Sequence, residues 1–391
     1  MPPSPSDIGF DGWHGGELRL RQGGGRRAGR GCELPRLGSH CSFWGLFSLT
    51  SRGTLDAVPP LRRHYTSFVA LSLGLLAACG GPFPQSTLAP VSDFGHDIDK
   101  LFTGIFWWAV VVFIVVEGLL LYSVLRFRHR EGAPSPKRHE GHTALEITWT
   151  LAPALILVLI AVPTVRTIFK TSGAAPAGAL RVEVIGHQWW WEYRYPDLGI
   201  VTANELHLPV GRPAAVDITS VDVVHSWWTP RLGGKRDAIP NRHTHIAFSP
   251  DSVGMYAGQC VEFCGASHAN MRLRTFVESD SAFQAWVAAQ RATPSAPAKD
   301  SLEETGRQAF QRYGCIGCHT VAGFATGIIG PNLTHVGGRT TIAGGTMMNT
   351  EQHLHDWIAD PPAMKPGSMM PNMHASPPDI TALVAYLQSL K

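Results

Sequence analysis

The chain has 391 residues, enough for two or three domains, because a single core rarely extends beyond about 250 residues. Nine of its 33 Lys and Arg residues and five of its 30 Asp and Glu residues lie in the first 78 positions. From residue 79 onward, 24 basic residues therefore stand against 25 acidic ones. This balance of charge leaves no excess of basic residues for binding nucleic acid, so we exclude that function. The apolar residues gather in two long runs, and this uneven distribution favours a membrane protein with polar domains.

The N-terminal residues fall into two parts. Residues 1–60 are rich in Gly and Arg and lack apolar periodicity, so we predict a disordered or non-native extension. Residues 61–78 combine a basic start with an apolar run that ends in Leu76-Ala77-Ala78, directly before Cys79. This order is typical of an export signal and resembles the lipobox of a bacterial lipoprotein, in which Cys79 would carry the lipid anchor. The alternative is a short apolar stretch with an incidental cysteine.

Residues 79–175 contain the two apolar runs, Leu101–Leu125 and Ile147–Phe169. Each is long enough to cross a bilayer as a helix, for which about 20 residues suffice, so we predict a two-helix transmembrane hairpin. The loop between them is basic, with Arg126, Arg128, Arg130, Lys137 and Arg138. The positive-inside rule places this loop in the cytoplasm of a bacterium, and both flanks on the periplasmic or extracytoplasmic side of the inner membrane.

Residues 176–291 alternate short β-rich runs with Pro and Gly, which predicts an antiparallel sandwich. The runs are Arg181–Ile185, Val201–Leu208, Ala214–Thr219, His245–Phe248 and Arg272–Val277. A Pro- and Ala-rich linker follows at 292–300. Residues 301–391 then read as helical, because Ser301 opens a capping box and Ser376 precedes Pro377 and an acid at the third helical position.

Soft metal ligands gather near the end of the sandwich region. Cys260, Cys264, His268 and Met271 lie within twelve residues, and His225 precedes them in Asp222-Val223-Val224-His225. Thiolates and imidazoles select copper or zinc, a single-copper site needs one Cys, and structural zinc does not need Met, so the set favours two bridged metals. A disulfide between the two cysteines is the alternative in an exported protein.

The C-terminal region carries Cys315-Ile316-Gly317-Cys318-His319, the pattern for covalent attachment of haem c, in which His319 ligates the iron. A thioredoxin-like redox pair would require a βαβ context, which the sequence lacks. The segment Lys365–Pro371 resembles the ligand loop of class I cytochromes c, in which the second iron ligand is the fourth residue after the Pro. That resemblance selects Met370, with Met373 as its rival.

The copper motif, together with Gly186-His187-Gln188-Trp189 and Asp237–Pro240, resembles the binuclear copper A domain of cytochrome c oxidase subunit II. The order of that domain and a cytochrome c resembles the subunit of caa3-type haem-copper oxidases. The expected fold is therefore multidomain: a two-helix transmembrane hairpin, a cupredoxin-like antiparallel β-sandwich and an all-α cytochrome c domain.

The resemblance also implies roles for single residues. Cys260 and Cys264 bridge two copper ions, His225 and Met271 complete one of them, and His268 with the carbonyl of Glu262 completes the other. The Glu262 side chain would meet a shared magnesium ion, Trp189 would receive electrons, and Glu146 would open a proton pathway. Plain packing in the run Trp189-Trp190-Trp191 and an ordinary interfacial carboxylate are the alternatives for Trp189 and Glu146.

The implied function is electron transfer from a soluble or membrane cytochrome c, or a bc1-type donor, through haem c and copper A to oxidase subunit I. That subunit would reduce O2 and pump protons, with subunit III as a further partner. A quinol oxidase subunit II has the same fold without the copper ligands, and nitrous oxide reductase shares the copper domain but brings its own catalytic domain. A copper-carrying lipoprotein would need neither a membrane hairpin nor a haem.

Overall fold

The computed structural model describes residues 83–128, 132 and 140–391, all of which belong to one compact unit, Gly80–Lys391. The expected extension, signal segment and lipidated Cys79 lie outside the described residues.

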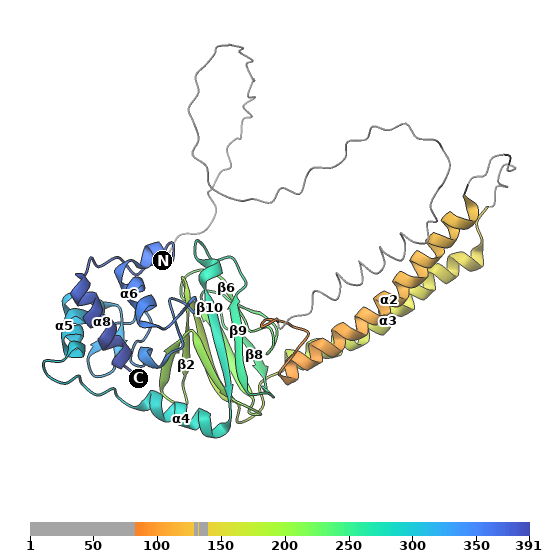
Figure 1. Ribbon diagram of the computed structural model, residues 1–391. Coiled ribbons are helices and arrows are strands. Elements are labelled where there is room, and N and C mark those ends of the chain that lie inside the picture. The colour runs from red at the N-terminus through yellow and green to blue at the C-terminus, as the bar shows by residue number, and fades with distance from the viewer. Residues whose placement is uncertain (1–82, 129–131, 133–139) are drawn as a thin grey trace, which may run out of the picture. The chain divides into compact units, whose positions relative to one another are not determined.

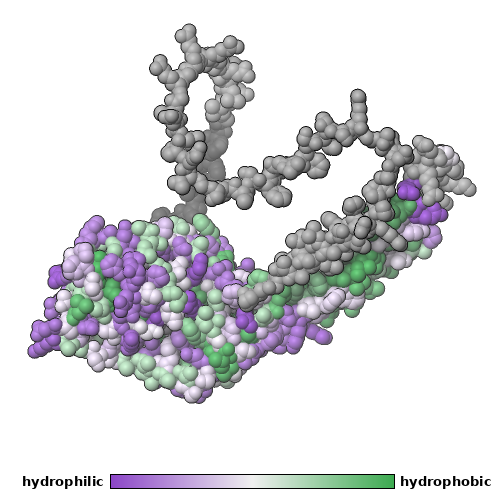
Figure 2. Space-filling view, viewed as in Figure 1, coloured by the Kyte–Doolittle hydropathy of each residue, from purple (hydrophilic) through white to green (hydrophobic). Residues whose placement is uncertain are grey.

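Two long helices lead the described chain, α2 (Asp93–Phe127) and α3 (Thr143–Thr171). Both are long and apolar enough to cross a membrane, with mean hydropathies of 2.4 and 2.2 over their best windows. They run alongside one another, and Figure 2 shows the described part of their surface as predominantly hydrophobic. The predicted hairpin is confirmed, and α3 accommodates Pro153 and Pro163 within its length.

The start of α2 is attached to the next domain rather than to the membrane. The Ser92 hydroxyl accepts from the amide of Gly95, which caps the helix, and donates to the carbonyl of Leu232. Phe94 is buried beside it, against Gly233 and Gly234. The first turn of α2 therefore belongs to the core of the β-domain.

That domain is a sandwich of two five-stranded sheets, with orders β3-β2-β1-β5-β8 and β4-β10-β9-β6-β7 (Figure 1). The strands are β1 (Leu180–His187), β2 (Trp190–Tyr195), β3 (Ile200–Ala203), β4 (Glu205–Pro209), β5 (Ala214–Ser220), β6 (His225–Trp228), β7 (Arg236–Ala238), β8 (Thr244–Phe248), β9 (Gly254–Cys260) and β10 (Arg272–Glu278). Its interior holds the fully buried rings of Trp191, Tyr193, Tyr195, Trp227 and Phe248. The helix α4 (Asp280–Arg291) then packs on the sandwich through Phe283 and Val287.

Two details differ from the sequence expectations. The pairs β1–β5 and β4–β10 are parallel, so the sandwich is mixed rather than wholly antiparallel. The expected single strand Val201–Leu208 is two strands in different sheets. Asn204 stands between them with φ +62°, a left-handed conformation that Asn tolerates better than most residues, and its side chain accepts from the amide of Trp191.

The C-terminal domain is mainly helical, as expected. Its helices are α5 (Leu302–Arg312), α6 (Glu351–Ala359), α7 (Pro361–Met364) and α8 (Pro377–Ser389). Two small ribbons are added, β11 (Thr320–Val321) with β12 (Ala325–Thr326) and β13 (Thr341–Ile342) with β14 (Met347–Met348). The expected caps are confirmed, because the hydroxyls of Ser301 and Ser376 accept from the amides of Glu304 and Asp379.

Helices α5 and α8 make the closest contact in that domain. A Cβ on Gly306 would lie 1.9 Å from the carbonyl oxygen of Ala382, so only glycine allows this approach. Phe310 and Tyr386 complete the crossing edge to face, with ring centroids 5.8 Å apart.

Candidate metal centres

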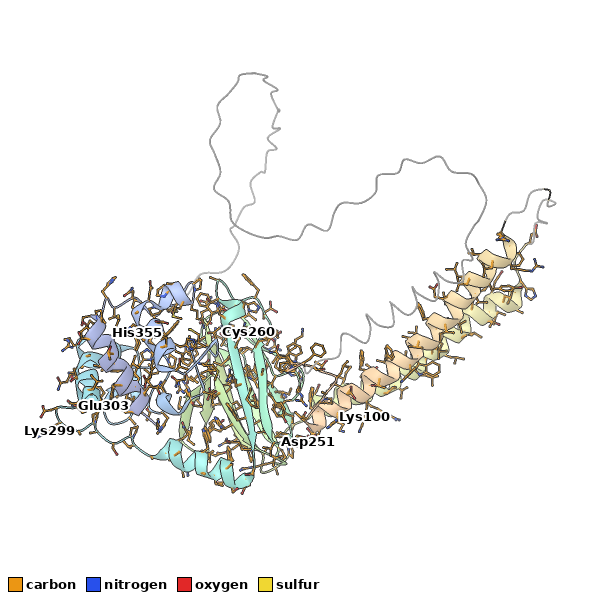
Figure 3. All side chains as sticks on the ribbon, in the orientation of Figure 1. Lys100, Asp251, Cys260, Lys299, Glu303 and His355 are labelled. Atoms are coloured by element: carbon orange, nitrogen blue, oxygen red, sulfur yellow. The ribbon has the colours of Figure 1, made fainter. Side chains whose placement is uncertain are left out.

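The copper ligands predicted from the sequence come together at one end of the sandwich, where Figure 3 labels Cys260. Cys260 ends β9, and the chain returns to β10 through a loop that contains the 3-10 turn His268–Asn270. The amide of Cys260 donates to the carbonyl of Met271 at 2.9 Å, which fixes the two ends of the loop together. The strands thus hold the loop in shape.

Four donor atoms surround the two thiols. The Sγ atoms of Cys260 and Cys264 are 3.8 Å apart, so no disulfide joins them, because an S–S bond is about 2.05 Å. His225 Nδ1 lies 4.0 Å from the Cys260 sulfur, and His268 Nδ1 lies 3.5 Å from the Cys264 sulfur. The Met271 sulfur is 3.9 Å from Cys264, and the carbonyl oxygen of Glu262 is 3.3 Å from Cys260.

The donor set fits soft metal ions in both chemistry and placement. Both thiols are buried, and His225 at the start of β6 is completely buried. The ligand atoms of His225, Cys260 and Cys264 lie within 4.8 Å of one another. Thiolate, imidazole and thioether are the ligands that copper prefers.

The charges around the thiols also favour a cation. The hydrogen bond from Cys264 lowers the pKa of Cys260, and the resulting thiolate raises that of Cys264. Two thiolates side by side therefore require positive charge between them, which metal ions supply.

The carboxylate of Asp222 holds the His225 imidazole in one orientation. Asp222 Oδ1 lies 2.7 Å from His225 Nε2, which leaves Nδ1 facing the thiols. The other oxygen of Asp222 accepts from the amide of Gln188 at 2.6 Å. Burial opposes the imidazolium, but the hydrogen bonds to Asp222 and Cys260 raise the pKa of His225. Asp222 thus has the orienting position that carboxylates often occupy behind metal-ligating histidines.

Trp189 lies directly beside this loop. Its side chain is buried, and its indole Nε1 donates to the carbonyl of Cys264 at 2.9 Å. The neighbouring Gln188 amide donates to the same oxygen at 2.8 Å. The ring is therefore hydrogen-bonded to the backbone of a copper-ligand candidate.

In the C-terminal domain, the attachment motif forms a 3-10 turn, Cys315–Gly317, after Gly314 in the left-handed conformation. His319 Nδ1 donates to the carbonyl of Pro331 at 2.8 Å, which leaves Nε2 as the free nitrogen. Burial lowers the pKa of His319, so the imidazole is neutral, the form that binds iron.

Two glycines let the backbone pack closely against His319 and Cys318. A Cβ on Gly330 would lie 2.5 Å from His319 Cε1, and one on Gly327 would lie 2.5 Å from the backbone of Cys318. Two free cysteines beside a neutral, oriented imidazole fit a covalent haem. Met370 and Met373 are both half-buried, whereas Met369 is 71% exposed, so the choice of Met370 stays a prediction.

The remaining predicted residues lie at the surface. Glu262 is exposed beside Phe263, which is 77% exposed, on the copper loop. Glu146 is exposed in the first turn of α3. Sequence reasoning missed two buried ionisable residues, Glu205 and Lys365, which join the sandwich to the C-terminal domain. The only local signal was a carboxylate, Glu205, beside the apolar Leu206 and Leu208 of its strand.

Known families match the three parts of the chain. Residues 85–167 match the transmembrane domain of cytochrome c oxidase subunit II, residues 200–278 its periplasmic domain, and residues 303–391 the cytochrome c family. Cytochrome c oxidase subunit 2 of Alkalihalophilus pseudofirmus is 37% identical over 83% of this chain and 95% of its own length. The chain belongs to the cytochrome c oxidase subunit II family.

Other members of the family are similar over comparable lengths. The subunit 2 of Bacillus subtilis is 34% identical over 84% of this chain and 98% of its own length. The solved periplasmic domain of cytochrome oxidase subunit II from Bradyrhizobium japonicum is 33% identical and covers 30% of this chain and 96% of its own, with a TM-score of 0.29. This subunit II carries a C-terminal cytochrome c domain, is part of an oxidoreductase complex in a membrane, and has sites for copper A and haem.

Proposed function

We propose that this subunit II accepts electrons on a covalent haem c in its C-terminal domain and delivers them, through a two-ion copper A centre, to oxidase subunit I. The donor would be a soluble or membrane cytochrome c or a bc1-type complex, and subunit III would complete the assembly. The observation that carries the proposal is the convergence of two thiols, two imidazoles and a thioether in one cluster around the buried cysteines. When bound, the copper pair and the haem each supply a one-electron carrier.

The protein residues hold these groups rather than react. Cys260 and Cys264 would bridge the coppers, with His225 and Met271 on one ion and His268 and the Glu262 carbonyl on the other. Asp222 keeps His225 in one orientation, and the tie between Cys260 and Met271 resists movement of the loop. A ligand set that moves little between redox states keeps the reorganisation cost of electron transfer low.

The attachment site works in the same way. Cys315 and Cys318 would form the thioether links, and His319 would ligate iron through Nε2, because Nδ1 is already engaged with Pro331. Met370 would be the second ligand, and a thioether in this position raises the potential of a haem.

Other roles concern the surroundings of the complex. The exposed Glu262 carboxylate would reach a magnesium ion shared with subunit I, and the adjacent Phe263 would contact that subunit. Glu146 would stand at the mouth of a proton pathway on the cytoplasmic side of the inner membrane. Cys79 would add a lipid anchor on the periplasmic side, where the copper and haem domains would both lie.

Replacement of Cys264 by Ser in the purified complex tests the copper assignment. We expect the mixed-valence copper signal in the electron paramagnetic resonance spectrum to disappear, because one bridging sulfur is lost, while the optical spectrum of haem c remains. Persistence of the mixed-valence signal in Cys264→Ser would show that the copper centre is elsewhere.

A further inference from the structure

The sandwich reaches the C-terminal domain through one buried carboxylate. Glu205, the first residue of β4, is 2% exposed. It accepts four hydrogen bonds from the ribbon strand β13 and the residue before it, from the amides of Thr340 and Thr341 at 2.9 Å each and from their hydroxyls at 2.6 and 2.8 Å. Hydrogen bonds to a carboxylate are stronger than neutral ones, and removal of the acceptor leaves buried donors unpaired.

A buried lysine of the C-terminal domain makes a second connection, this time to the sandwich. Lys365 belongs to the C-terminal domain and is 4% exposed. Its Nζ donates to the carbonyl of Trp189 in the sandwich at 2.5 Å and to that of Ala343 in its own domain at 3.0 Å. Burial lowers the pKa of Lys365 to about 7, so the position is costly for its charge and the two carbonyls offset that cost.

Between these contacts, Trp189 touches both domains. Its Nε1 is bonded to the carbonyl of Cys264, whereas its far edge faces Gly367. A Cβ on Gly367 would lie 2.7 Å from Trp189 Cη2, and Gly367 has φ +80°, so a side chain there is excluded on two counts. Gly367 stands three residues before Met370. One indole therefore spans from the copper loop to the predicted iron-ligand loop.

Two further hydrogen bonds join the copper domain to the C-terminal domain beside Trp189. The hydroxyl of Ser267 donates to the carbonyl of Pro366 at 2.6 Å, and the amide of Arg272 donates to the carbonyl of Gly344 at 2.8 Å. Both start from the copper loop or the strand that follows it. The Trp189 face of the copper domain is thus covered by residues 343–367 of the same chain.

We propose that Glu205 and Lys365 form a two-point latch that seats the C-terminal domain on Trp189, so that this domain is the resident partner of the copper site. The inference rests on the proposed function and deepens it. An outside donor then reduces the haem domain, because Trp189 is 8% exposed and its contact face is already occupied. The linker 292–300 supports the latch, since tethering alone gives an effective concentration on the order of millimolar.

Hydrogen exchange on the full chain in lipid nanodiscs, with copper and haem loaded, tests the seating. In Glu205→Gln and in Lys365→Met we expect faster exchange at the amides of Thr340 and Thr341 and also at the amide of Arg272, which is bonded to neither latch residue. Glu351→Gln and Lys299→Met are the matched controls, because both side chains are exposed on the C-terminal half of the chain. A change confined to Thr340 and Thr341 in Glu205→Gln would overturn the latch.

The rate of internal electron transfer after photoreduction of haem c is the second measurement. We expect each latch variant to slow this transfer at least about tenfold with both redox potentials unchanged, and Glu205→Asp to recover part of the rate. Lys365→Met keeps the test valid if Glu205→Gln fails to fold. Unchanged rates in variants that load both groups would refute the latch alone, whereas absence of the copper or haem signal from the unaltered chain would refute the proposed function.

Discussion

The two metal-binding domains prepare their sites in different ways. In the copper domain, strands on both sides of one loop bring the donor atoms of Cys260, Cys264 and His225 within a few ångströms of each other. In the C-terminal domain, one ligand, His319, is oriented by the carbonyl of Pro331, and the backbone packs closely against it at Gly330. The copper domain thus assembles its predicted ligand set within one cluster, whereas the C-terminal domain orients a single ligand and carries its predicted methionine ligand on a separate segment.

The difference predicts that the two sites can be lost separately. In Gly306→Val, the added side chain would collide with the carbonyl of Ala382 and separate α5 from α8, at a cost above about 4 kcal/mol, as for the most damaging core substitutions. We expect the variant to lose covalent haem, measured by haem staining, and to retain the copper signal. Retention of normal haem would show that the two helices can shift without loss of the domain.

The predicted haem ligand Met370 lies on a loop, whereas the copper ligands are held by strands, so its loss tests the second half of the comparison. Met370→Leu should convert low-spin haem c to a high-spin form, because the iron loses its second strong ligand, and visible absorption measures the change. Met373→Leu is the matched control, since Met373 is half-buried in the same segment. The reverse result, with low-spin haem lost only in Met373→Leu, would exchange the two assignments.

A smaller effect, on copper affinity, is expected from Asp222, which is hydrogen-bonded to the copper-ligand candidate His225. In Asp222→Asn, His225 loses the carboxylate that orients it, and such losses typically cost about 10- to 100-fold in metal affinity. Competition with a copper chelator measures the affinity, and the mixed-valence signal should survive at saturating copper. An unchanged affinity would mean that burial in the sandwich alone orients His225.

The smallest effect concerns a half-buried ion pair on α5, between Arg307 and Glu304. The hydrogen bonds from Arg307 and Gln308 lower the pKa of Glu304 to about 2. A lowered carboxylate pKa stabilises the fold above the unfolded value of about 4.5, and the stabilisation is lost as the pH falls through about 2. Glu304→Gln should therefore lower Tm slightly at pH 7, and the difference from the unaltered chain should shrink between pH 4.5 and pH 2. A difference that is independent of pH would contradict this.

Local patterns in the sequence were enough for part of this structure. The caps at Ser301 and Ser376 depend on residues three positions apart, and the copper loop depends on spacing within twelve residues, so both could be predicted. The strands β2, β6, β7 and β9 lie outside the five β-rich runs that the sequence pattern indicated. Trp190–Tyr195 lacks alternation because five of its six residues are buried, and β7 has three residues.

Contacts between distant segments could not be predicted. The left-handed Asn204 is stabilised by Trp191, which only the folded pairing of β2 and β3 brings near. Glu205 finds its partners 135 and 136 residues along the chain. A charged residue in a β-run signals a special environment, but the sequence does not say which distant segment provides it.

The capped start of α2 has a mechanical consequence. Because the Ser92 hydroxyl bonds both to the helix and to Leu232, the membrane helix continues into the sandwich without a flexible joint. At 35 residues, α2 is about 50 Å long, well beyond the roughly 30 Å of a hydrocarbon core. Insertion of one residue in its middle would displace the attached end of α2 by about 1.5 Å and turn it by about 100° against α3, whose chain continues into β1 of the same sandwich. The length of α2 therefore contributes to the height of the copper loop above the bilayer.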